Sequence, residues 1–594
     1  MGKQSVRPAT RSSWLPAFLC FLMLLISLFR IVSTYHVLSQ AYDEPAHIAC
    51  GMEWLNKGTY TLEPLHPPLA RIAVALGPYL AGLRLPAVRI LQDQHGRSYD
   101  IFGAGNDILA ESDYFKTLSL ARLGVLPFFV LSVIMVFWWT RELFGDWAAV
   151  LAVLTYTNLP PILAFFGLAY TDPVLTALVP WSLFSFSSWI EKRTATRAMV
   201  LGLSVGLAIL SKFTALLFLP PCFLVILAAK WTIRGTSDSP RRWRLIQRSS
   251  WTVLLAALTL VLVIWAGFRF SLNRIPKPPQ EMAALELLPR PLRFISIQVL
   301  RVAPWIPAQS FFEGIESDLR MNAEAPPSYL FGNIRRGGWW YFFIAAVALK
   351  TPIAFLILSA VGMVAILAAP TPVRDWQHLV PLLCVIAILV VTMPARINYG
   401  VRHVLVVYPL MAIVAGRGGM YLWERRTNLR LLARMALCLL LGWQIISAAR
   451  AHPDYISYFN EVGTKSSADY LLWGCDLDCG QDTHRLVEVL KNRGIDDITL
   501  CLFTSADIKS LGLPKVNQCV PYQRNTGWFA ASIRLIKTGD AFWGGKHPDA
   551  YAWLSGYTPV TTIGKTVLLY YIPRNTPPET IPQARPKSPT SLSQ

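Results

Sequence analysis

The stretch Ser39–Arg71 reads SQAYDEPAHIACGMEWLNKGTYTLEPLHPPLAR and joins two apolar segments of the chain. It carries an acidic pair, Asp43 and Glu44, and His47 follows one helical turn after the aspartate. His66, with two prolines after it, leads into the second apolar segment. Carboxylates between apolar segments are costly unless they have partners or a function. The stretch is therefore either a solvated loop without chemistry or part of a site.

The composition is that of a membrane protein. Of the 594 residues, 54% are hydrophobic and only 15% are charged, with a mean hydropathy of +0.41. A protein with many membrane-spanning helices needs this much apolar surface, whereas a water-soluble one does not. The net charge of +20 does not indicate nucleic acid binding, because residues 452–594 hold 14 Lys/Arg against 13 Asp/Glu. The positive charge lies mainly in short connections between apolar runs, as in membrane proteins with basic cytoplasmic loops.

The chain divides into three parts. Residues 1–450 predict an α-helical, polytopic membrane domain with about eleven spans. Residues 451–575 predict a small α/β domain, and residues 576–594, rich in Pro, Ser and Thr, predict a disordered tail. Within the α/β domain we expect a helix at 482–494 and strands at 497–503, 528–536 and 566–572.

Two apolar runs are unusual. The run 198–229 is longer than one crossing needs and is interrupted at Lys212 and at two later prolines, which predicts two shorter helices meeting near Lys212. The run 339–369 predicts one span with Lys350 inside it. A third run, 69–83, is too short to cross and predicts an interfacial or re-entrant helix.

Basic residues predict the orientation. Lysine and arginine precede the first span, and the connection 230–248 holds six basic residues and one acidic residue, which places both in the cytoplasm. The loops 39–117 and 269–338 then face outside, and the odd number of spans places the C-terminal domain there too. We therefore expect a multi-pass protein of the inner or plasma membrane. The alternative for the first apolar run, a cleaved signal peptide, lacks an obvious small-residue cleavage site.

Four cysteines lie in the polar C-terminal part: Cys475, Cys479, Cys501 and Cys519. In an oxidising compartment they can form two disulfides, and all three pairings are open. A zinc site is the weaker alternative, because no second pair of ligands lies at zinc-like spacing.

Basic residues are normally enriched in cytoplasmic loops, so those on the predicted outer loops are unexpected. They are therefore candidates for binding an anion. They are Lys212, Arg335, Arg336, Arg396, Arg402 and His403, with Lys350 inside a span. A lipid phosphate is the anion found at that depth in a membrane. The alternative is that these side chains only reach toward lipid headgroups.

The acids and histidines of the outer loops have a complementary use; they are Asp43, Glu44, His47, His66 and Asp172. A sugar that leaves a polyprenyl phosphate has a stable leaving anion and needs no general acid. It does need a carboxylate that aligns or deprotonates the incoming hydroxyl, and cations that receive the charge on the phosphate. This chemistry requires no cofactor. The same groups could hold a divalent cation, but nothing in the sequence calls for a metal.

Seven blocks of sequence, taken in order, resemble a known family. They are DE-x-x-H from Asp43, HPPL from His66, YTDP from Tyr170, GLAILSKFTALLFLPP around Lys212, GWWYFFIAAVALKTP, INYGVRHVLVVYPLM, and ISYFNEVG followed by DLDCGQD. This order is similar to that of the protein O-mannosyltransferase-like group of membrane glycosyltransferases with the C-type fold, in its bacterial and archaeal branch.

The resemblance implies an inverting transferase that uses a polyprenyl- or dolichyl-phosphate sugar on the outer face of the membrane. Asp43 would be the catalytic base with Glu44 beside it, and Arg402 and His403 would lie near the lipid phosphate. His66 would shape the substrate groove, while Asp172 matches an acidic turn that lines the same cavity. The chain departs from the family at residues 478–482, where DCGQD replaces D-W-G-Q-D, and the nearby Cys475 indicates a local disulfide with Cys479.

A polytopic transporter or flippase of a lipid-linked or anionic substrate is the alternative from another class, and a scaffold without activity is a third. Transporters commonly show two related halves and charges at mid-membrane. Here the halves look unrelated and the charges gather on the outer loops, so we expect the transferase. The sugar stays open, as does the acceptor: protein Ser/Thr, a lipid or a cell-wall polymer.

Overall fold

The computed structural model describes residues 14–574 except for 94–95, 235–241, 275–289, 291–292, 295–296, 299–304, 370–374, 426–427, 464–473, 509, 514, 540 and 542–548. The N-terminal basic residues and the predicted tail 576–594 lie outside the described part, as does some of the predicted cytoplasmic connection 230–248.

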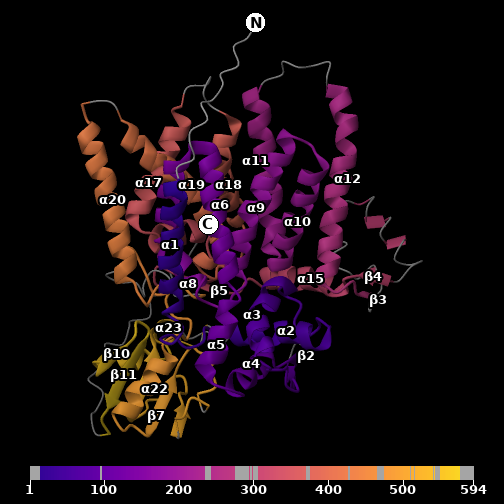
Figure 1. Cartoon of the computed structure of the whole chain (residues 1–594). Helices are drawn as coiled ribbons and strands as arrows, with labels where there is room; N and C mark the ends of the chain where they lie inside the picture. Colours follow the sequence, from indigo (N-terminus) through magenta and orange to yellow (C-terminus); the bar gives the residue numbers. More distant parts are fainter. Residues whose placement is uncertain are drawn as a thin grey trace, which may run out of the picture.

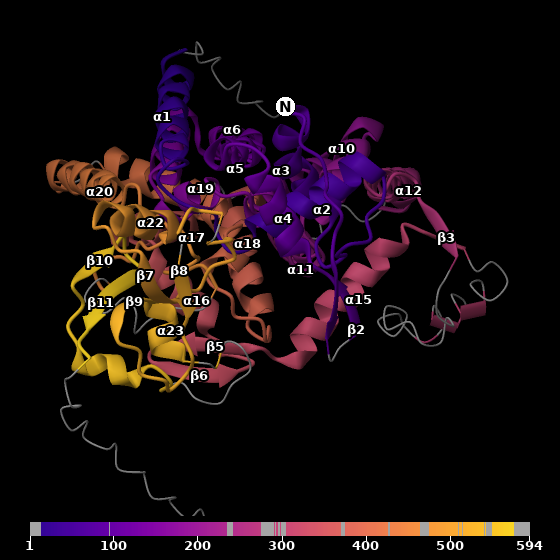
Figure 2. The ribbon, with the colours of Figure 1, turned by 90° about the horizontal axis from the view of Figure 1, so that it is seen from below.

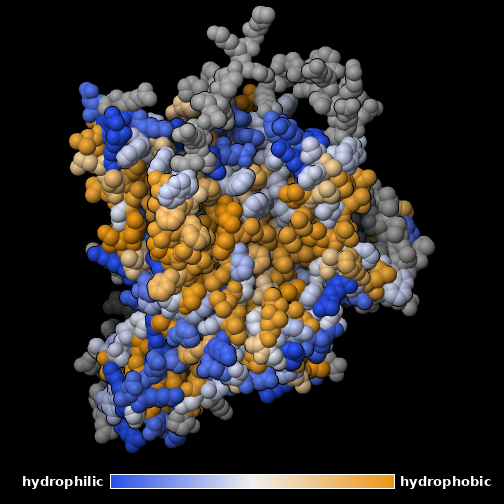
Figure 3. All heavy atoms as spheres, in the orientation of Figure 1, coloured by the Kyte–Doolittle hydropathy of each residue, from blue (hydrophilic) through white to orange (hydrophobic). Residues whose placement is uncertain are grey.

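Apolar helices stand side by side in the upper part of the molecule (Figure 1), and a band of hydrophobic surface surrounds them (Figure 3). They are α1 (Trp14–Val32), α6 (Leu126–Phe144), α7 (Asp146–Thr157), α9 (Asp172–Glu191), α10 (Ala195–Ser211), α11 (Thr214–Arg234), α12 (Arg242–Gly267), α17 (Ile353–Leu367), α18 (Trp376–Thr392), α19 (Val407–Glu424) and α20 (Arg430–Arg450). Their outward side chains are large and apolar, for example on α1 and α20. An exposed apolar belt of this kind is what a bilayer covers.

The helices confirm the predicted mostly helical, polytopic class of membrane protein. Among the described residues, six helices are long and apolar enough to cross a membrane, or seven if the bent pair α16–α17 is one span. This is fewer than the predicted eleven or so, since α7, α10 and α18 are shorter than a full span yet stand beside the long helices.

Proline and extended backbone explain two breaks in the helical layer. At Lys212 the backbone is extended (φ −163°, ψ 138°), so α10 ends and α11 begins there, as the sequence predicts. The predicted span 339–369 is not one continuous helix. Thr351 is extended before Pro352, so the run divides into α16 (Phe342–Lys350) and α17, which meet at 114°.

The lower end of the molecule is built from the two predicted outer loops. The first loop forms α2 (Glu44–Lys57), α3 (Pro68–Leu80), β1 (Ile90–Asp93), β2 (Gly96–Tyr99), α4 (Ile101–Ala110) and α5 (Tyr114–Leu123). The described parts of the second loop form β3 (Leu272–Arg274), β4 (Trp305–Pro307), α15 (Gln309–Glu324), β5 (Pro327–Leu330) and β6 (Asn333–Arg336). Seen from below, α15 runs across this end from the side of β5 and β6 toward β3 (Figure 2).

A five-stranded sheet lies beside these loops, in the order β10-β11-β9-β7-β8. Its strands are β7 (Asp497–Cys501), β8 (Lys515–Gln518), β9 (Gly527–Ser532), β10 (Thr561–Ile563) and β11 (Val567–Ile572), and α22 (Thr483–Asn492) packs on it. β7 is parallel to β8 and β9, while β11 is antiparallel to β9 and β10. The predicted helix and strands are confirmed, except that the end of the run 528–536 forms α23 (Ile533–Thr538).

Candidate active site

A cavity of about 780 Å³ opens at the lower end of the helical layer, where loop residues from distant parts of the chain meet. Seven of the predicted site residues line it: Asp43, His47, His66, Asp172, Lys212, Arg402 and His403. Its apolar lining includes side chains from the first turns of α11 and the end of α18, the helices that continue into the hydrophobic layer, together with side chains of α15. The cavity thus joins charged side chains to an apolar wall.

Asp43 and Arg402 form an ion pair in this cavity. The Arg402 guanidinium donates a hydrogen bond of 2.7 Å to the Asp43 carboxylate, whose side chain keeps 28% of its surface exposed. Asp43 precedes α2, and Arg402 lies on the short 3-10 helix η2 (Val401–Val404) between α18 and α19. Burial alone would raise the pKa of Asp43, but Arg402 and then His47 outweigh it, so the pKa lies below its ordinary value. The carboxylate is therefore ionised at neutral pH.

Arg402 has capacity for a further acceptor. Its Nε–H is buried and has no hydrogen-bond partner among the described residues. Its guanidinium also lies 5.0 Å from the centre of the Tyr170 ring. Buried donors in proteins are nearly always satisfied, and guanidinium groups suit phosphate and carboxylate oxygens. An anion in the cavity would meet this unfilled donor.

Three histidines line the cavity in their neutral form. Burial, followed by the charge of Arg71, lowers the pKa of His47 to about 3 and that of His66 well below its ordinary range. Burial and Lys212 lower the pKa of His403 in the same direction. His47 accepts a hydrogen bond from Arg71 at Nδ1 (3.3 Å), so its Nε2 carries the proton of the neutral ring. His47 is thus a hydrogen-bond donor at Nε2 rather than a base.

Lys212 and Asp172 form a second ion pair, with Nζ 2.5 Å from the carboxylate. Lys212 lies at the break between α10 and α11, and Asp172 lies in the first turn of α9. The helix break puts this lysine between the two helices, and its side chain lines the cavity. Both side chains face the same cavity as Asp43.

Glu44 is not among the residues that line the cavity, although it follows Asp43 directly. Its side chain is fully buried and receives two hydrogen bonds, of 2.9 and 2.8 Å, from the fully buried Arg122. It also accepts the backbone N–H groups of Ala41 and Ala169, both at 2.7 Å. Successive residues at a helix start point in different directions, and Glu44 points into the protein.

Lys350 and Arg396 also lie outside the cavity lining. Lys350 ends α16, where its buried ammonium donates to the carbonyl of Ile456 (2.8 Å) and to that of Asp476. Arg396 is exposed and contacts the end of α15 through its backbone N–H and guanidinium. The predicted phosphate-binding role of these two cations therefore finds no support in their positions, because other groups already occupy Lys350 and Arg396 points to the surface.

Four further residues at the site were missed in the sequence. Arg71 bonds His47 and Glu63, and Tyr170 lies under Arg402. Asp318 and Asn322, four residues apart on α15, line the cavity, and burial raises the pKa of Asp318 while Lys212 opposes this. Arg71 could have been found, since an arginine inside an apolar helix needs a partner. The other three carry no comparable local signal.

No group of three or more His, Cys, Asp or Glu side chains in the described part of the chain is placed to hold a metal ion.

Comparison with known proteins finds a family model that matches part of the chain. Residues 116–268, about a quarter of the chain, match the family model "Dolichyl-phosphate-mannose-protein mannosyltransferase". No curated protein sequence matches the chain. Similar solved structures include ArnT from Cupriavidus metallidurans bound to undecaprenyl phosphate. The similarity has 13% sequence identity and a TM-score of 0.47, and it covers 94% of this chain and 98% of ArnT.

Two other solved structures are similar more loosely. The archaeal oligosaccharyltransferase AglB from Archaeoglobus fulgidus, in complex with an inhibitory peptide and a dolichol-phosphate, is 12% identical with a TM-score of 0.44, covering 93% of this chain and 74% of AglB. The Pmt1–Pmt2 protein O-mannosyltransferase of S. cerevisiae, bound to its sugar donor, is 14% identical with a TM-score of 0.33, covering 44% of this chain and 34% of the yeast chain. Residues 116–268 are therefore similar to that mannosyltransferase family, and the sequence motifs outside this range carry the same resemblance.

Proposed function

We propose that this glycosyltransferase moves a sugar from a polyprenyl-phosphate donor to an acceptor hydroxyl with inversion at the anomeric carbon, and that Asp43 is the base. The observation that carries the proposal is the Asp43–Arg402 pair facing a cavity whose apolar wall continues into the helical layer. A lipid-linked sugar phosphate needs this combination, because its tail is apolar while its reacting end is anionic.

In the proposed reaction, the ionised Asp43 carboxylate accepts the proton of the acceptor hydroxyl as its oxygen attacks the anomeric carbon. The bond between that carbon and the phosphate oxygen breaks, and polyprenyl phosphate leaves as an anion. The unfilled Nε–H of Arg402 is placed to receive the growing negative charge. His47, as a neutral Nε2–H donor, can bond a sugar or phosphate oxygen without competing for the proton.

Each cation of the cavity already has a carboxylate partner: Arg402 has Asp43, Lys212 has Asp172 and Arg71 has Glu63. The donor phosphate therefore shares Arg402 with the base. This arrangement keeps the base and the leaving group on one guanidinium, which fixes their relative positions for an in-line displacement.

We further propose that the reaction takes place at the outer face of the inner or plasma membrane, with the N-terminus in the cytoplasm and the C-terminal domain outside; the basic connections in the sequence support this orientation. A single cysteine introduced at exposed Glu111, in the same loop as Asp43, tests this. Labelling of intact cells or spheroplasts by a membrane-impermeant maleimide supports it, and labelling only after lysis contradicts it.

Asp43→Asn tests the catalytic assignment. The change keeps the size of the side chain but removes the base, so kcat should fall at least about a hundredfold, while the melting temperature changes little. The measurement follows sugar released from polyprenyl-phosphate mannose by membranes of a deletion strain that expresses each variant; these membranes also supply the acceptor. Glu111→Gln, an exposed carboxylate of the same loop, is the matched control and should keep full activity. Normal transfer by Asp43→Asn would remove Asp43 as the base.

A further inference from the structure

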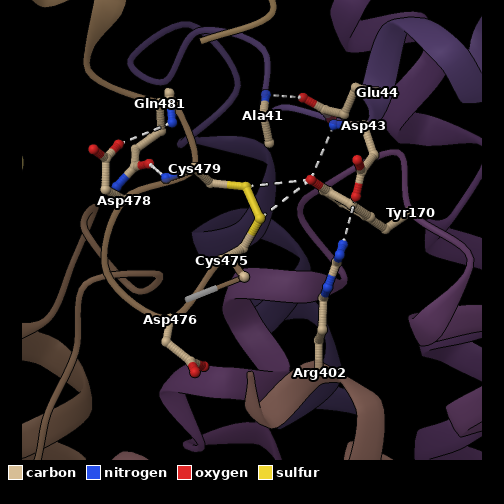
Figure 4. The surroundings of a disulfide bond; sticks show 12 residues. Ala41, Asp43, Glu44, Tyr170, Arg402, Cys475, Asp476, Asp478, Cys479 and Gln481 are labelled. Carbon is tan, nitrogen blue, oxygen red and sulfur yellow. Dashed lines mark hydrogen bonds and ion pairs between the residues drawn. A yellow bond between two sulfur atoms is a disulfide. The ribbon is translucent and has the colours of Figure 1, made fainter. Parts of the chain in front are cut away.

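Tyr170 contacts three of the groups assigned to the cavity, and Figure 4 shows it beside two of them, Asp43 and Arg402. Its hydroxyl oxygen accepts a hydrogen bond of 3.2 Å from the backbone N–H of Asp43. The Arg402 guanidinium lies over its ring, and the ring of His47 meets it edge-on at 5.7 Å between centres. Tyr170 itself is fully buried, in the turn that precedes α9. Its position therefore sets where the base and its cation lie.

A disulfide lies against the hydroxyl group of Tyr170. Cys475 and Cys479 are joined, and their sulfur atoms lie 3.3 and 3.2 Å from the Tyr170 hydroxyl oxygen. Both cysteines are buried. The sequence-based expectation of a local Cys475–Cys479 disulfide is confirmed.

The same segment also holds the backbone just before Asp43. The N–H of Tyr42 donates to the carbonyl of Cys479 (2.9 Å), and the N–H of Ser39 donates to that of Gln481 (3.0 Å). The chain that leads to Asp43 is thus attached to the disulfide segment by hydrogen bonds, and Asp43 is attached to Tyr170. The backbone hydrogen bonds hold residues 39 and 42, whereas Tyr170 links the sulfur atoms to the N–H of Asp43 itself.

We propose that Tyr170 is a positioning residue for Asp43 and Arg402, and that the Cys475–Cys479 disulfide holds Tyr170 in place, so that reduction of this disulfide slows sugar transfer. The kinetic part of the proposal rests on the proposed function. In the reduction, a dithiol reductant supplies two electrons and two protons, the S–S bond breaks, two S–H groups form, and the reductant becomes its own disulfide. Two thiols cannot stay at bonding distance, so at least one sulfur must shift from its position beside Tyr170.

The remaining cysteines of the described part provide controls. Cys438 is exposed on α20, and Cys519 lies in the C-terminal sheet beside the hydroxyl of Tyr551. Neither contacts Tyr170, Asp43 or Arg402 through any hydrogen bond or ring contact in the structure. Their serine variants therefore report on reduction elsewhere in the protein.

The first experiment measures transfer from polyprenyl-phosphate mannose by membranes before and after treatment with dithiothreitol, with alkylation and mass spectrometry to verify reduction of Cys475 and Cys479. Wild-type kcat should fall about tenfold, with a smaller change in the KM for the donor. The variant Cys475→Ser/Cys479→Ser should be slow at the start and insensitive to dithiothreitol, whereas Cys438→Ser and Cys519→Ser should respond as the wild type does. An unchanged wild-type kcat after verified reduction would overturn the proposal.

Tyr170→Phe separates positioning from general loosening of the fold. It removes the hydroxyl that joins Asp43 to the disulfide, so kcat should fall about tenfold and dithiothreitol should change it by less than twofold. Full sensitivity to dithiothreitol in Tyr170→Phe would show that the disulfide does not act through Tyr170.

Hydrogen exchange supplies a readout that does not depend on activity. The amide of Asp43 should exchange faster in purified wild-type protein after reduction, and equally fast with or without reductant in Tyr170→Phe. If no variant transfers sugar, the proposed function fails, yet this exchange result still decides the positioning role. Unchanged exchange in reduced wild type would refute that role.

Discussion

At the scale of single residues, the adjacent acids Asp43 and Glu44 have different surroundings and different roles. Asp43 is part-exposed in the cavity with Arg402, while Glu44 is fully buried with Arg122 and two backbone N–H groups. A fully satisfied buried ion pair stabilises only as long as both partners are present. Glu44 therefore anchors the start of α2 to α5 and to the turn before α9.

Glu44→Gln tests this division. The change leaves the Arg122 guanidinium buried without a counter-charge, which costs about 3–5 kcal/mol in comparable pairs. We expect a melting temperature lower by several degrees in a thermal-shift assay of the purified protein, whereas Asp43→Asn melts close to wild type. A Glu44→Gln protein that melts like wild type but transfers no sugar would show that Glu44 has a catalytic rather than a structural role.

At the scale of elements, the site depends on how closely α2 lies on α3. A methyl group at Gly51 on α2 would come within 1.9 Å of the carbonyl oxygen of Arg71 on α3, so only glycine fits there. Arg71 in turn holds His47, one turn before Gly51, through its Nε–H. The close approach of the two helices therefore places the donor face of His47 in the cavity.

Gly51→Ala should push α2 away from α3 and cost about 1–3 kcal/mol, as overpacking of a close contact does. The melting temperature should fall, and kcat should fall with it because His47 and the start of α2 move. Gly442→Ala on α20 is the matched control: it is also helical, and nothing lies within 4 Å of the added methyl group. Equal behaviour of the two variants in thermal-shift and transfer assays would contradict the close-packing argument.

At the scale of the whole molecule, the cavity joins groups that are far apart in the chain. Asp43 and Arg402 are 359 residues apart, and Lys212 and Asp172 reach the same space from a helix break and a helix start. The cavity also contains three histidines that burial and neighbouring cations keep neutral. The whole assembly therefore responds to pH.

Acid should destabilise the folded protein below about pH 6.5. The pKa of His47 is about 3 in the folded protein, against an ordinary value of 6.5. Between these pH values the unfolded chain therefore binds a proton at His47 that the folded chain does not bind. The free energy of unfolding is therefore highest above pH 6.5. It decreases as the pH falls toward 3, by up to about 1.4 kcal/mol per pH unit for this histidine. Asp43, whose pKa is lowered in the folded protein, also decreases the free energy of unfolding in acid, but only below its ordinary pKa of 3.8.

Melting temperatures at pH 7.5, 6.5, 5.5 and 4.5 test this prediction. His47→Asn should flatten the decline, while His36→Asn, at an exposed position beyond α1, should leave the slope unchanged. A wild-type melting temperature that stays constant down to pH 4.5 would contradict the neutral state of the buried histidines.

Local chemistry in the sequence determined the helical membrane layer, the helix break at Lys212, the strands of the C-terminal sheet, and the loops that hold Asp43 and Arg402. Apolar length, proline and alternation act over neighbouring residues, so a sequence can show them directly. Even the local disulfide between residues 475 and 479 follows from residues that are close in the chain.

Only the tertiary structure decided which charges meet. It paired Glu44 with Arg122, satisfied Lys350 with backbone carbonyls, bent the chain after that lysine, and placed Tyr170 between the disulfide and the base. These contacts join residues separated by tens to hundreds of positions, and their formation depends on how the helices pack. The direction of a side chain at a helix start or turn is likewise set by packing, which is why two adjacent acids and several similar cations could not be told apart before folding.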